Sequence, residues 1–292
     1  MRLYGRDRVI ALLMLGIPLA FELVWVLWPA LQSIYISTLD WDGFSQPTFV
    51  GLENYASLPE DPLFTQSLWN TLKWLVAFGV LSVAGGLLLA LAVHQRISGW
   101  RFYRSAFFAP IAVSFVVTGL VWRWMLAPTG VINQALEMVG LEGVTQNWLG
   151  DPNLALWSII AAATWRQVGY IMILFLAGLT AVDKSVLEAA SVDGASSLQK
   201  FWHVTLPALA PATTIIIAVT VIDSLRTFDI IWTMTQGGPF NSTDVLSTYM
   251  WREAFQYLHL GYGSAVAIVI LSLSVGFIIV YLRRVLGKAA SA

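Results

Sequence analysis

The 292-residue chain contains no cysteine, and only 11% of its residues are charged. The absence of cysteine excludes disulfide bonds and thiolate metal sites. Hydrophobic residues make up 58% of the chain and the mean hydropathy is +0.72, which excludes an ordinary water-soluble domain because a soluble core cannot hide so much apolar surface. The net charge is only -1 and gives no reason to expect a nucleic-acid partner. Lipid is therefore the expected surrounding of most of the chain.

The chain also lacks the short motifs that mark nucleotide and metal sites. A phosphate-binding loop reads G-x-x-x-x-G-K-[ST], but Gly287-Lys288 is followed by Ala289, and no glycine stands five positions before Gly287. The histidines are too far apart to form the H-x-x-x-H pair of a zinc hydrolase (His94, His203 and His259). We therefore predict that this chain is not an enzyme and holds no metal and no cofactor.

Long apolar segments are what the chain has instead. A membrane-spanning helix needs about 20 mostly apolar residues. Six segments meet that length, at about 9–36, 72–93, 105–126, 155–179, 208–232 and 264–282. The first is too long for the core of a cleaved signal peptide, so we expect it to be retained. The prediction is an all-α, polytopic membrane protein with six transmembrane helices, in which residues 1–292 form a single domain.

The basic residues are distributed unevenly between the predicted loops. Short loops on the cytoplasmic side of a membrane carry an excess of Lys and Arg. Most of the 16 Lys and Arg residues fall at the chain ends and in alternate loops, namely Arg2, Arg6, Arg8, Arg96, Arg101, Arg104, Lys184, Lys200, Arg283, Arg284 and Lys288. The other loops are rich in Asp and Glu. This alternation predicts that both termini are cytoplasmic.

The loop between the fourth and fifth segments, about residues 183–207, has a helical pattern of its own. Its apolar residues at helical spacing are Val186, Leu187 and Ala190, then Leu198, Phe201 and Trp202. Gly194 permits a turn with positive φ, and Pro207 enforces a break before the fifth segment. We predict two short amphipathic helices joined at a fixed corner. Lipid headgroups, the protein's own helices or a partner protein would each cover such apolar stripes.

The same loop resembles a known motif. Glu188-Ala189-Ala190, Asp193-Gly194-Ala195, Phe201 and Leu206-Pro207 are similar to the EAA loop of binding-protein-dependent ABC importer permeases. That loop reads E-A-A, three variable residues, G, and later I-x-L-P. The form E-A-A-x-x-D-G-A is the one seen in the sugar-importer branch. Val204 stands here at the usual isoleucine position, which is a mild departure.

Further resemblances to this family follow in order along nearly the whole chain. They are Phe49 to Tyr55, Trp69-Asn70-Thr71, Phe102-Tyr103-Arg104, Phe107 to Pro110, Trp122-Arg123-Trp124, Thr235 to Pro239, Thr243, Ala254-Phe255 and Leu260 to Ala265. Their common order and spacing make the resemblance specific. The chain resembles the six-span, maltose-type carbohydrate importer permeases.

The resemblance implies a multi-subunit importer of the bacterial-type cytoplasmic (inner) membrane. In that family, a permease pairs with a second permease subunit, usually a different chain in the maltose type. Two ATPase subunits hold ATP and Mg²⁺, and an extracytoplasmic solute-binding protein delivers a sugar-like substrate. The residues implied in ATPase coupling are Glu188, Ala189, Ala190, Asp193, Gly194, Ala195, Leu206 and Pro207, with a short coupling helix between spans four and five. The outer loop is Gly237-Gly238-Pro239.

Ionisable residues within the apolar segments are costly, which makes a paired or functional role the default. Glu22 and Arg166 fall near the middle of the first and fourth segments, where a structural ion pair and a substrate role are the alternatives. An importer driven by an ion gradient through Glu22 and Asp223 is the competing interpretation of the whole chain. A scaffold subunit held together by small residues such as Gly86 and Ala90 is a third.

The fifth segment carries the densest group of charged residues. Asp223, Arg226 and Asp229 step by three, so each is a neighbour of the next on a helix. Together with Trp165 and Tyr170 of the fourth segment, they are the residue types that bind the hydroxyls and ring faces of a sugar. The alternatives are a structural pair between Arg226 and either Asp, and a position of Asp229 among the headgroups.

Overall fold

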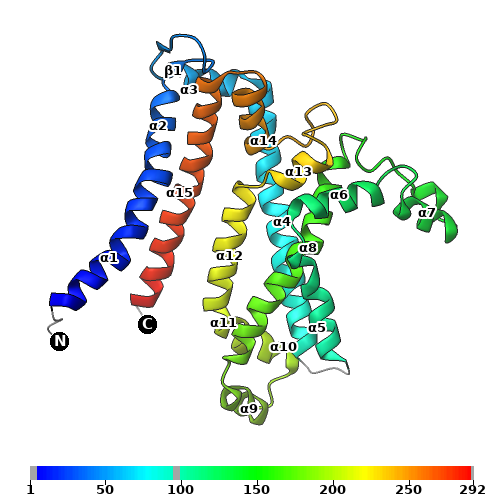
Figure 1. Cartoon of the computed structure of the whole chain (residues 1–292). Helices are drawn as coiled ribbons and strands as arrows, with labels where there is room; N and C mark the ends of the chain where they lie inside the picture. The colour runs from blue at the N-terminus through cyan, green and yellow to red at the C-terminus, as the bar shows by residue number, and fades with distance from the viewer. Residues whose placement is uncertain (1–4, 95–98, 291–292) are drawn as a thin grey trace. The chain divides into compact units, whose positions relative to one another are not determined.

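The computed structural model describes residues 5–94 and 99–290, which are helical apart from loops and one two-stranded sheet (Figure 1). The chain divides into two compact units, Met1–Pro62 with Met250–Ser272 and Leu63–Tyr249 with Leu273–Ala292. Among the described residues, four helices are long and apolar enough to cross a membrane: Leu13–Ile36, Pro62–His94, Ala155–Thr180 and Leu260–Tyr281. Two bent helix pairs bring the number to six if each is one span. Arg2 and Arg96, which contribute to the predicted orientation, lie outside the described residues.

The first unit begins with one continuous helical run. It consists of α1 (Gly5–Glu22), a π-helical turn η1 (Leu23–Leu27) and α2 (Trp28–Ile36). Apart from Glu22, Gln32 and Ser33, the side chains from Leu13 to Ile36 are mostly apolar, and none of these residues is buried. A helix that is apolar on every side needs lipid or another subunit to cover it.

Short polar elements follow in the first unit. They are β1 (Leu39–Asp40), paired antiparallel with β2 (Thr48–Phe49), then α3 (Glu53–Ser57) and η2 (Leu58–Glu60). In the turn between the strands, the Asp42 carboxylate accepts hydrogen bonds from the backbone N–H groups of Ser45 and Phe44, at 2.7 and 2.9 Å, and these lower the pKa of Asp42 to about 2. Asn54 Nδ2 donates to the backbone oxygen of Ser37 at 2.9 Å. These contacts tie the segment after the first helix into an ordered cap.

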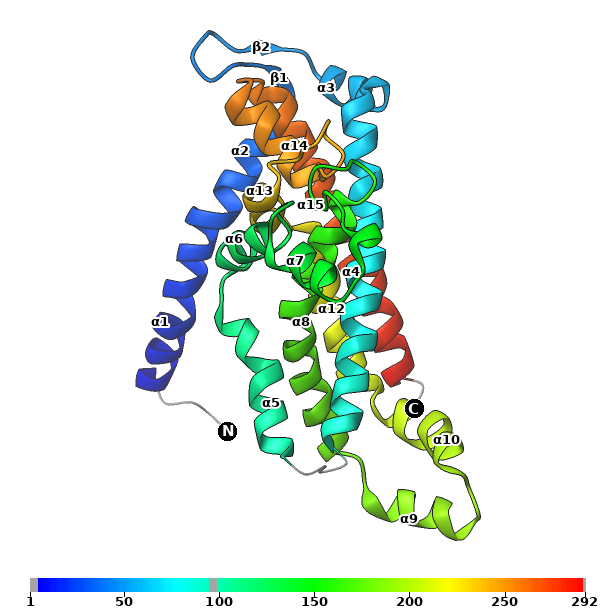
Figure 2. The same cartoon turned by 90° about the vertical axis from the view of Figure 1, so that its right-hand side faces the viewer.

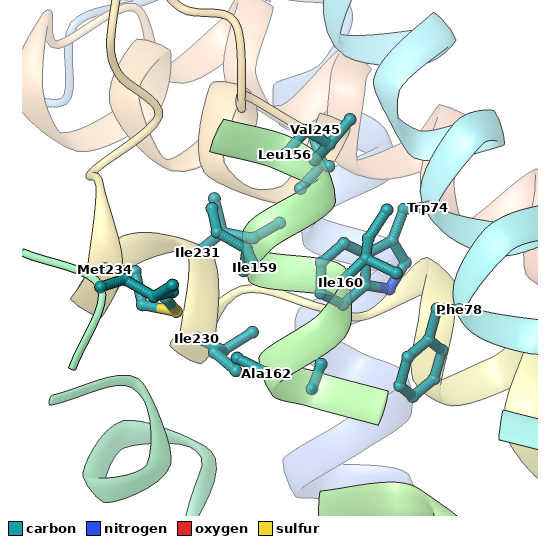
Figure 3. Close-up of a cluster of buried hydrophobic side chains, with 12 residues drawn as sticks. Trp74, Phe78, Leu156, Ile159, Ile160, Ala162, Ile230, Ile231, Met234 and Val245 are labelled. Carbon is teal, nitrogen blue, oxygen red and sulfur yellow. The ribbon is translucent and has the colours of Figure 1, made fainter. Parts of the chain in front are cut away.

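The second unit is built around α8 (Ala155–Thr180). The helices beside it are α4 (Pro62–His94), α12 (Ala210–Leu225) and α13 (Asp229–Met234). Figure 3 shows Ile159 and Ile160 of α8 between Ile230 and Ile231 of α13 on one side and Trp74 of α4 on the other, all of them buried. Farther along α8, a Cβ at Gly86 of α4 would lie 2.4 Å from the side chain of Ile171. Small residues therefore let α4 and α8 approach closely, which is typical of membrane helices.

The third apolar segment is not the single helix that hydropathy predicts for residues 105–126. It forms α5 (Trp100–Phe108), a 3-10 turn η3 (Ala109–Ala112) and α6 (Phe115–Met125), with a bend of 102°. Pro110 interrupts the helix because it has no backbone N–H, and Val113 is extended, with φ -90° and ψ 133°. Ser114 then caps α6 by accepting a hydrogen bond from the N–H of Val117 at 3.3 Å.

The fifth apolar segment is also broken, although one helix is predicted for residues 208–232. The helix Ser197–Ala208 meets α12 at 66°, and α12 itself ends at Leu225. Asp229 begins the new helix α13 and does not continue the face that carries Asp223 and Arg226. The prediction that these three residues follow one another on one helix is therefore wrong.

The remaining elements are short, apart from the last helix. They are α7 (Val131–Met138), η4 (Glu142–Val144), α9 (Lys184–Val192), α10 (Ser197–Lys200), η5 (Phe201–Thr205), α11 (Leu206–Ala208), α14 (Leu246–Trp251), η6 (Arg252–Gln256) and α15 (Leu260–Ala290). In the second unit, the Asn133 side chain accepts a hydrogen bond from Trp148 Nε1 at 2.8 Å and donates to the backbone oxygen of Gln146 at 2.9 Å. One buried amide thus fixes the loop between η4 and α8.

Gly169 allows the packing between α8 and the bent third segment to be tested. A Cβ at Gly169 would lie 1.8 Å from the backbone oxygen of Phe107. We expect Gly169→Ala to lower the stability of the purified protein by about 1–3 kcal/mol, because the backbone must shift to accept the methyl group. The measurement is thermal unfolding in detergent.

Gly276→Ala in α15 is the matched control, since nothing lies within 4 Å of that position. It should leave stability unchanged or raise it by up to ~1 kcal/mol, the helix propensity of Ala over Gly. Equal unfolding midpoints for the two variants would contradict the close contact.

Candidate functional site

A cavity of about 510 Å³ lies in the second unit, where the two broken segments meet α4 and α8. The lining residues are Trp74 and Phe78 of α4, Ile111 and Phe115 at the third-segment bend, Arg166, Gln167 and Tyr170 of α8, and Val219, Asp223, Arg226, Thr227, Phe228, Asp229 and Ile230 around the fifth-segment break. Irregular backbone at membrane depth is tolerated where it lines a cavity. The cavity and the two breaks therefore belong together.

Three charged residues predicted for the substrate pathway line this cavity, namely Asp223, Arg226 and Asp229. Gln167 Nε2 lies 3.5 Å from the Asp223 carboxylate, a long hydrogen bond. Within the described part of the chain, no ion pair joins the three charged side chains to one another. They keep hydrogen-bonding capacity that a bound solute can use.

The two predicted aromatic residues lie in different places. Tyr170 lines the cavity. Trp165 does not, because its side chain is 48% exposed and its ring packs against Trp122, with 5.9 Å between ring centroids. Successive residues of a helix are turned by about 100°, so Trp165 lies off the face that carries Arg166 and Tyr170. Sequence reasoning also missed Gln167, whose signal was a lone amide within an apolar span.

Arg166 contacts the bent third segment. Its Nε donates to the backbone oxygen of Val113 at 2.7 Å, and its Nη2 lies 3.4 Å from the backbone oxygen of Ile111. The guanidinium carbon lies 4.1 Å from the centroid of the Phe115 ring. Arg166 therefore contacts two backbone carbonyls and one aromatic face of the bent third segment.

The EAA segment, residues 183–207, contains α9, α10, η5 and α11, and both views show α9 at the end of the second unit, beyond α8 and α10 (Figures 1 and 2). Gly194 at its corner has φ +79°. The N–H of Ala195 donates to the oxygen of Ala190 at 2.9 Å, and that of Gly194 donates to the oxygen of Ser191 at 3.2 Å. This is the Schellman pattern of a helix end. Lys200 Nζ adds a hydrogen bond to Ser191 Oγ at 3.1 Å, which joins α10 to α9.

Both short helices also have caps at their starts. Asp183 accepts a hydrogen bond from the N–H of Ser185 at 2.8 Å, and this bond lowers the pKa of Asp183 below its usual value. The cap therefore remains charged at neutral pH. Ser196 and Gln199 form a reciprocal capping box at the start of α10. Local hydrogen bonds thus fix the corner without help from the rest of the fold.

The EAA segment exposes apolar side chains. The exposed apolar residues are Val186, Val192, Leu198 and Trp202. A cavity of about 810 Å³ lies between α9, α10 and the end of α4, and its lining includes Glu188, Lys200 and Leu91. A lipid surface and a partner protein both match this amphipathic face.

The predicted outer loop is a compact turn. Gly237 has φ +88°, a conformation that suits glycine. Thr243 Oγ1 donates to the backbone oxygen of Gly238 at 2.8 Å and lies 2.7 Å from Thr235 Oγ1. Gly238 and Pro239 line a third cavity, of about 450 Å³. Hydrogen bonds from backbone and hydroxyl groups of the second unit therefore fix the conformation of this loop.

The start of α4 supports the same loop. α4 begins at Pro62, before the predicted start at 72, because its first turns mix polar and apolar residues but are still helical. Asn70 Nδ2 donates to the backbone oxygens of Ser242 and Asp244, both at 2.9 Å. Thr71 Oγ1 accepts a hydrogen bond from the N–H of Leu246 at 2.9 Å. Asn70 and Thr71 of the Trp69-Asn70-Thr71 motif therefore anchor the stretch 242–246 that follows this loop.

The chain matches one protein family over most of its length. The family model for the binding-protein-dependent transport system inner membrane component matches residues 82–291, a range that includes the EAA segment and most of the cavity lining. The chain belongs to this family. It is therefore an inner membrane component of a transport system that works with a binding protein.

Two relatives are similar to this chain over nearly its whole length. The probable ABC transporter permease protein YurN of Bacillus subtilis is 33% identical, over 96% of this permease and 97% of the relative. The sulfoquinovosyl glycerol transport system permease protein SmoG of Agrobacterium fabrum is 34% identical, over 97% of this permease and 92% of the relative. Both relatives are permease proteins of transport systems.

The solved structures show the same fold. The permease resembles a subunit in the crystal structure of a bacterial ABC transporter involved in the import of the acidic polysaccharide alginate, with a TM-score of 0.82 and 22% identity. The alignment covers 96% of this permease and 95% of that chain. The permease therefore has the mostly helical fold of an ABC importer permease.

The chemistry of the permease itself was predicted to involve no metal and no cofactor. Within residues 5–94 and 99–290, no three His, Asp or Glu side chains gather closely enough to hold a metal ion. The relatives are permease proteins, which agrees with a non-enzymatic subunit. That ATP and Mg²⁺ bind in a partner subunit stays a prediction.

The corner of the EAA segment provides the test of this site. Nothing lies within 4 Å of a Cβ at Gly194, so only its positive φ requires glycine. We expect Gly194→Val to strain the corner by about 1–2 kcal/mol and to reduce ATP-dependent uptake in membrane vesicles. Gly194→Asn is the matched control, because Asn tolerates the left-handed region, and it should retain most uptake. Equal uptake by the two variants would show that the corner angle is unimportant.

Proposed function

We propose that this permease forms half of the pathway through which a sugar or sugar-like solute crosses the inner membrane. The observation that carries the proposal is one cavity in which three charged side chains, with no ion pair among them in residues 5–94 and 99–290, lie beside aromatic rings. Such side chains bind hydroxyl groups, while aromatic faces cover the apolar faces of a sugar ring. The name of SmoG, which assigns it to sulfoquinovosyl glycerol transport, supports a carbohydrate-type solute.

The proposed topology is a single permease domain, residues 1–292, with six spans and both termini in the cytoplasm. Each bent helix pair then counts as one span beside the four long helices. The basic residues in alternate loops support this orientation. The two bends provide the irregular backbone on which transporter binding sites are commonly built.

The EAA segment is the proposed link to a partner ATPase subunit, which would bind ATP and Mg²⁺. Its locally fixed corner and exposed apolar side chains support this role, because a lever must be rigid and must present a docking face. In this proposal the motif residues Glu188, Ala189, Ala190, Asp193, Gly194 and Ala195 form the docking helix and its corner, and Leu206 and Pro207 lead into α12.

The other proposed partners are a second permease subunit, encoded as a different chain, a second ATPase subunit and an extracytoplasmic solute-binding protein. The unburied first helix supports a large contact with lipid or a subunit. The loop at Gly237, Gly238 and Pro239 is the proposed outer surface near the binding protein. Family membership favours this function over an ion-gradient transporter that uses Glu22 and Asp223.

The energy source gives the direct test of this function. We expect the permease, reconstituted with its partner subunits, to take up solute only with ATP and to continue when the ion gradient is collapsed. In this proposal Glu188 makes a polar contact at the docking surface. Glu188→Lys should therefore reduce uptake about tenfold, since reversal of its charge there costs about 1.4 kcal/mol or more. Glu142→Lys, an exposed glutamate in η4, is the control and should behave as the wild type. Uptake that persists without ATP but stops with the ion gradient would contradict the proposal.

The cavity has its own test, with a matched pair of aromatic residues. We expect Tyr170→Leu to raise the solute concentration for half-maximal uptake about tenfold, because it removes a ring and a hydroxyl from the lining. Trp165→Leu should change that concentration less than about twofold, since Trp165 lies outside the lining. Asp223→Asn should act like Tyr170→Leu. The reverse order of the two aromatic variants would place the pathway elsewhere.

A further inference from the structure

Arg166 has an arrangement that neither solute binding nor ATPase coupling explains. Between η3 and α6 the chain is extended at Val113, so the helical hydrogen-bond ladder is interrupted. Carbonyl groups at the end of a helical turn have no intrahelical partner. Arg166 Nε donates to the Val113 oxygen at 2.7 Å, and Nη2 lies 3.4 Å from the Ile111 oxygen. The side chain from α8 thus meets two carbonyls at the interruption.

The chemistry of this contact favours arginine. In the hydrocarbon region, an unpaired carbonyl is costly because no lipid group can donate to it. A guanidinium is planar and carries several donors in a fixed fork, so it can reach two carbonyls together, whereas a lysine acts as a single point charge. The Phe115 ring, 4.1 Å from the guanidinium carbon, provides a favourable face for the cation.

A second contact lies three residues along α8. A Cβ at Gly169 would meet the backbone oxygen of Phe107 at 1.8 Å, so the two backbones are already as close as glycine permits. Arg166 and Gly169 lie on one face of α8, because residues three apart are neighbours on a helix. α8 therefore holds the bent segment both before and after Pro110.

We propose that Arg166 is a positioning residue that fixes the bend of the third segment against α8 and so sets one wall of the cavity. Ile111 and Phe115, which Arg166 contacts, are both lining residues. The inference rests on the proposed function only in taking this cavity as the solute pathway. In this proposal the guanidinium of Arg166 holds the backbone, and solute contacts fall to other lining residues such as Asp223 and Arg226.

The absence of native cysteine from this chain makes a distance measurement possible without background labelling of the permease, provided that the partner subunits are cysteine-free variants. Spin labels at Val121→Cys in α6 and Ala177→Cys in α8 would report the angle of the bend, since both positions are exposed. The assembled transporter in lipid nanodiscs is measured without solute. Arg166→Met should shift and broaden the distance distribution, and Arg166→Lys should give an intermediate result because it restores one donor. In uptake assays, Arg166→Met should raise the half-maximal solute concentration about tenfold.

Two outcomes would overturn the proposal. The first is an unchanged distance distribution in Arg166→Met together with lost uptake, which would make Arg166 a direct solute contact. The second concerns Arg166→Lys, which decides if Arg166→Met does not assemble. A distance distribution in Arg166→Lys identical to that of the parent would overturn the proposal. Wild-type uptake by Tyr170→Leu would count against the proposed pathway. It would not affect the result for Arg166, because the distance measurement needs no solute.

Discussion

The fold depends on one constraint, the need of every backbone N–H and C=O in hydrocarbon for a hydrogen-bond partner within the protein. α4 and α8 meet it as unbroken helices. The third and fifth segments do not, because their helices stop near Val113 and at Leu225. Such breaks are tolerable where side chains or enclosed water replace the missing partners. The cavity lies where both breaks occur, and its polar side chains come from the same stretches.

The EAA segment meets the same need for satisfied backbone groups in a different way. Its corner at Gly194 pairs its own carbonyls through the Schellman bonds, and caps at Asp183 and Ser196 satisfy the helix starts. These bonds are local, so the corner keeps its angle whatever covers its apolar face. The bent third segment differs, because Arg166 reaches it from another helix. One region of the second unit is thus fixed locally and the other through tertiary contacts.

This difference explains what could be predicted from the sequence. The corner at Gly194 follows from local rules, since a glycine between two amphipathic stretches permits the positive φ that the structure contains. The apolar segments follow from hydropathy, which averages composition over about 20 residues and therefore misses interruptions. Pro110 was a visible signal for the first break. The break at Arg226 has no glycine or proline, so only tertiary packing decides where α12 ends.

In the candidate site too, some residues could be predicted from the sequence and others depend on tertiary packing. Asp223, Arg226 and Asp229 were found because charge in an apolar segment is conspicuous, and they line one cavity although they do not share one helix. Helical phase alone would have excluded Trp165, since Arg166 and Tyr170 are four residues apart and Trp165 is turned away from them. Gln167 was overlooked because an uncharged amide changes hydropathy little. Its place beside Asp223 depends on how α8 and α12 pack, which no local pattern contains.

The order of elements in the second unit places the EAA segment where, in the proposed mechanism, its movement would reach both α8 and α12. α8 leads into this segment and α12 leads out of it. Arg166 of α8 lies 14 residues before Thr180, about 21 Å at 1.5 Å per residue, and Asp223 lies near the far end of α12. A displacement of the corner therefore acts on the near ends of two helices that both contribute lining residues to the cavity. Because α8 also holds the third-segment bend through Arg166, movement of α8 would carry that bend with it.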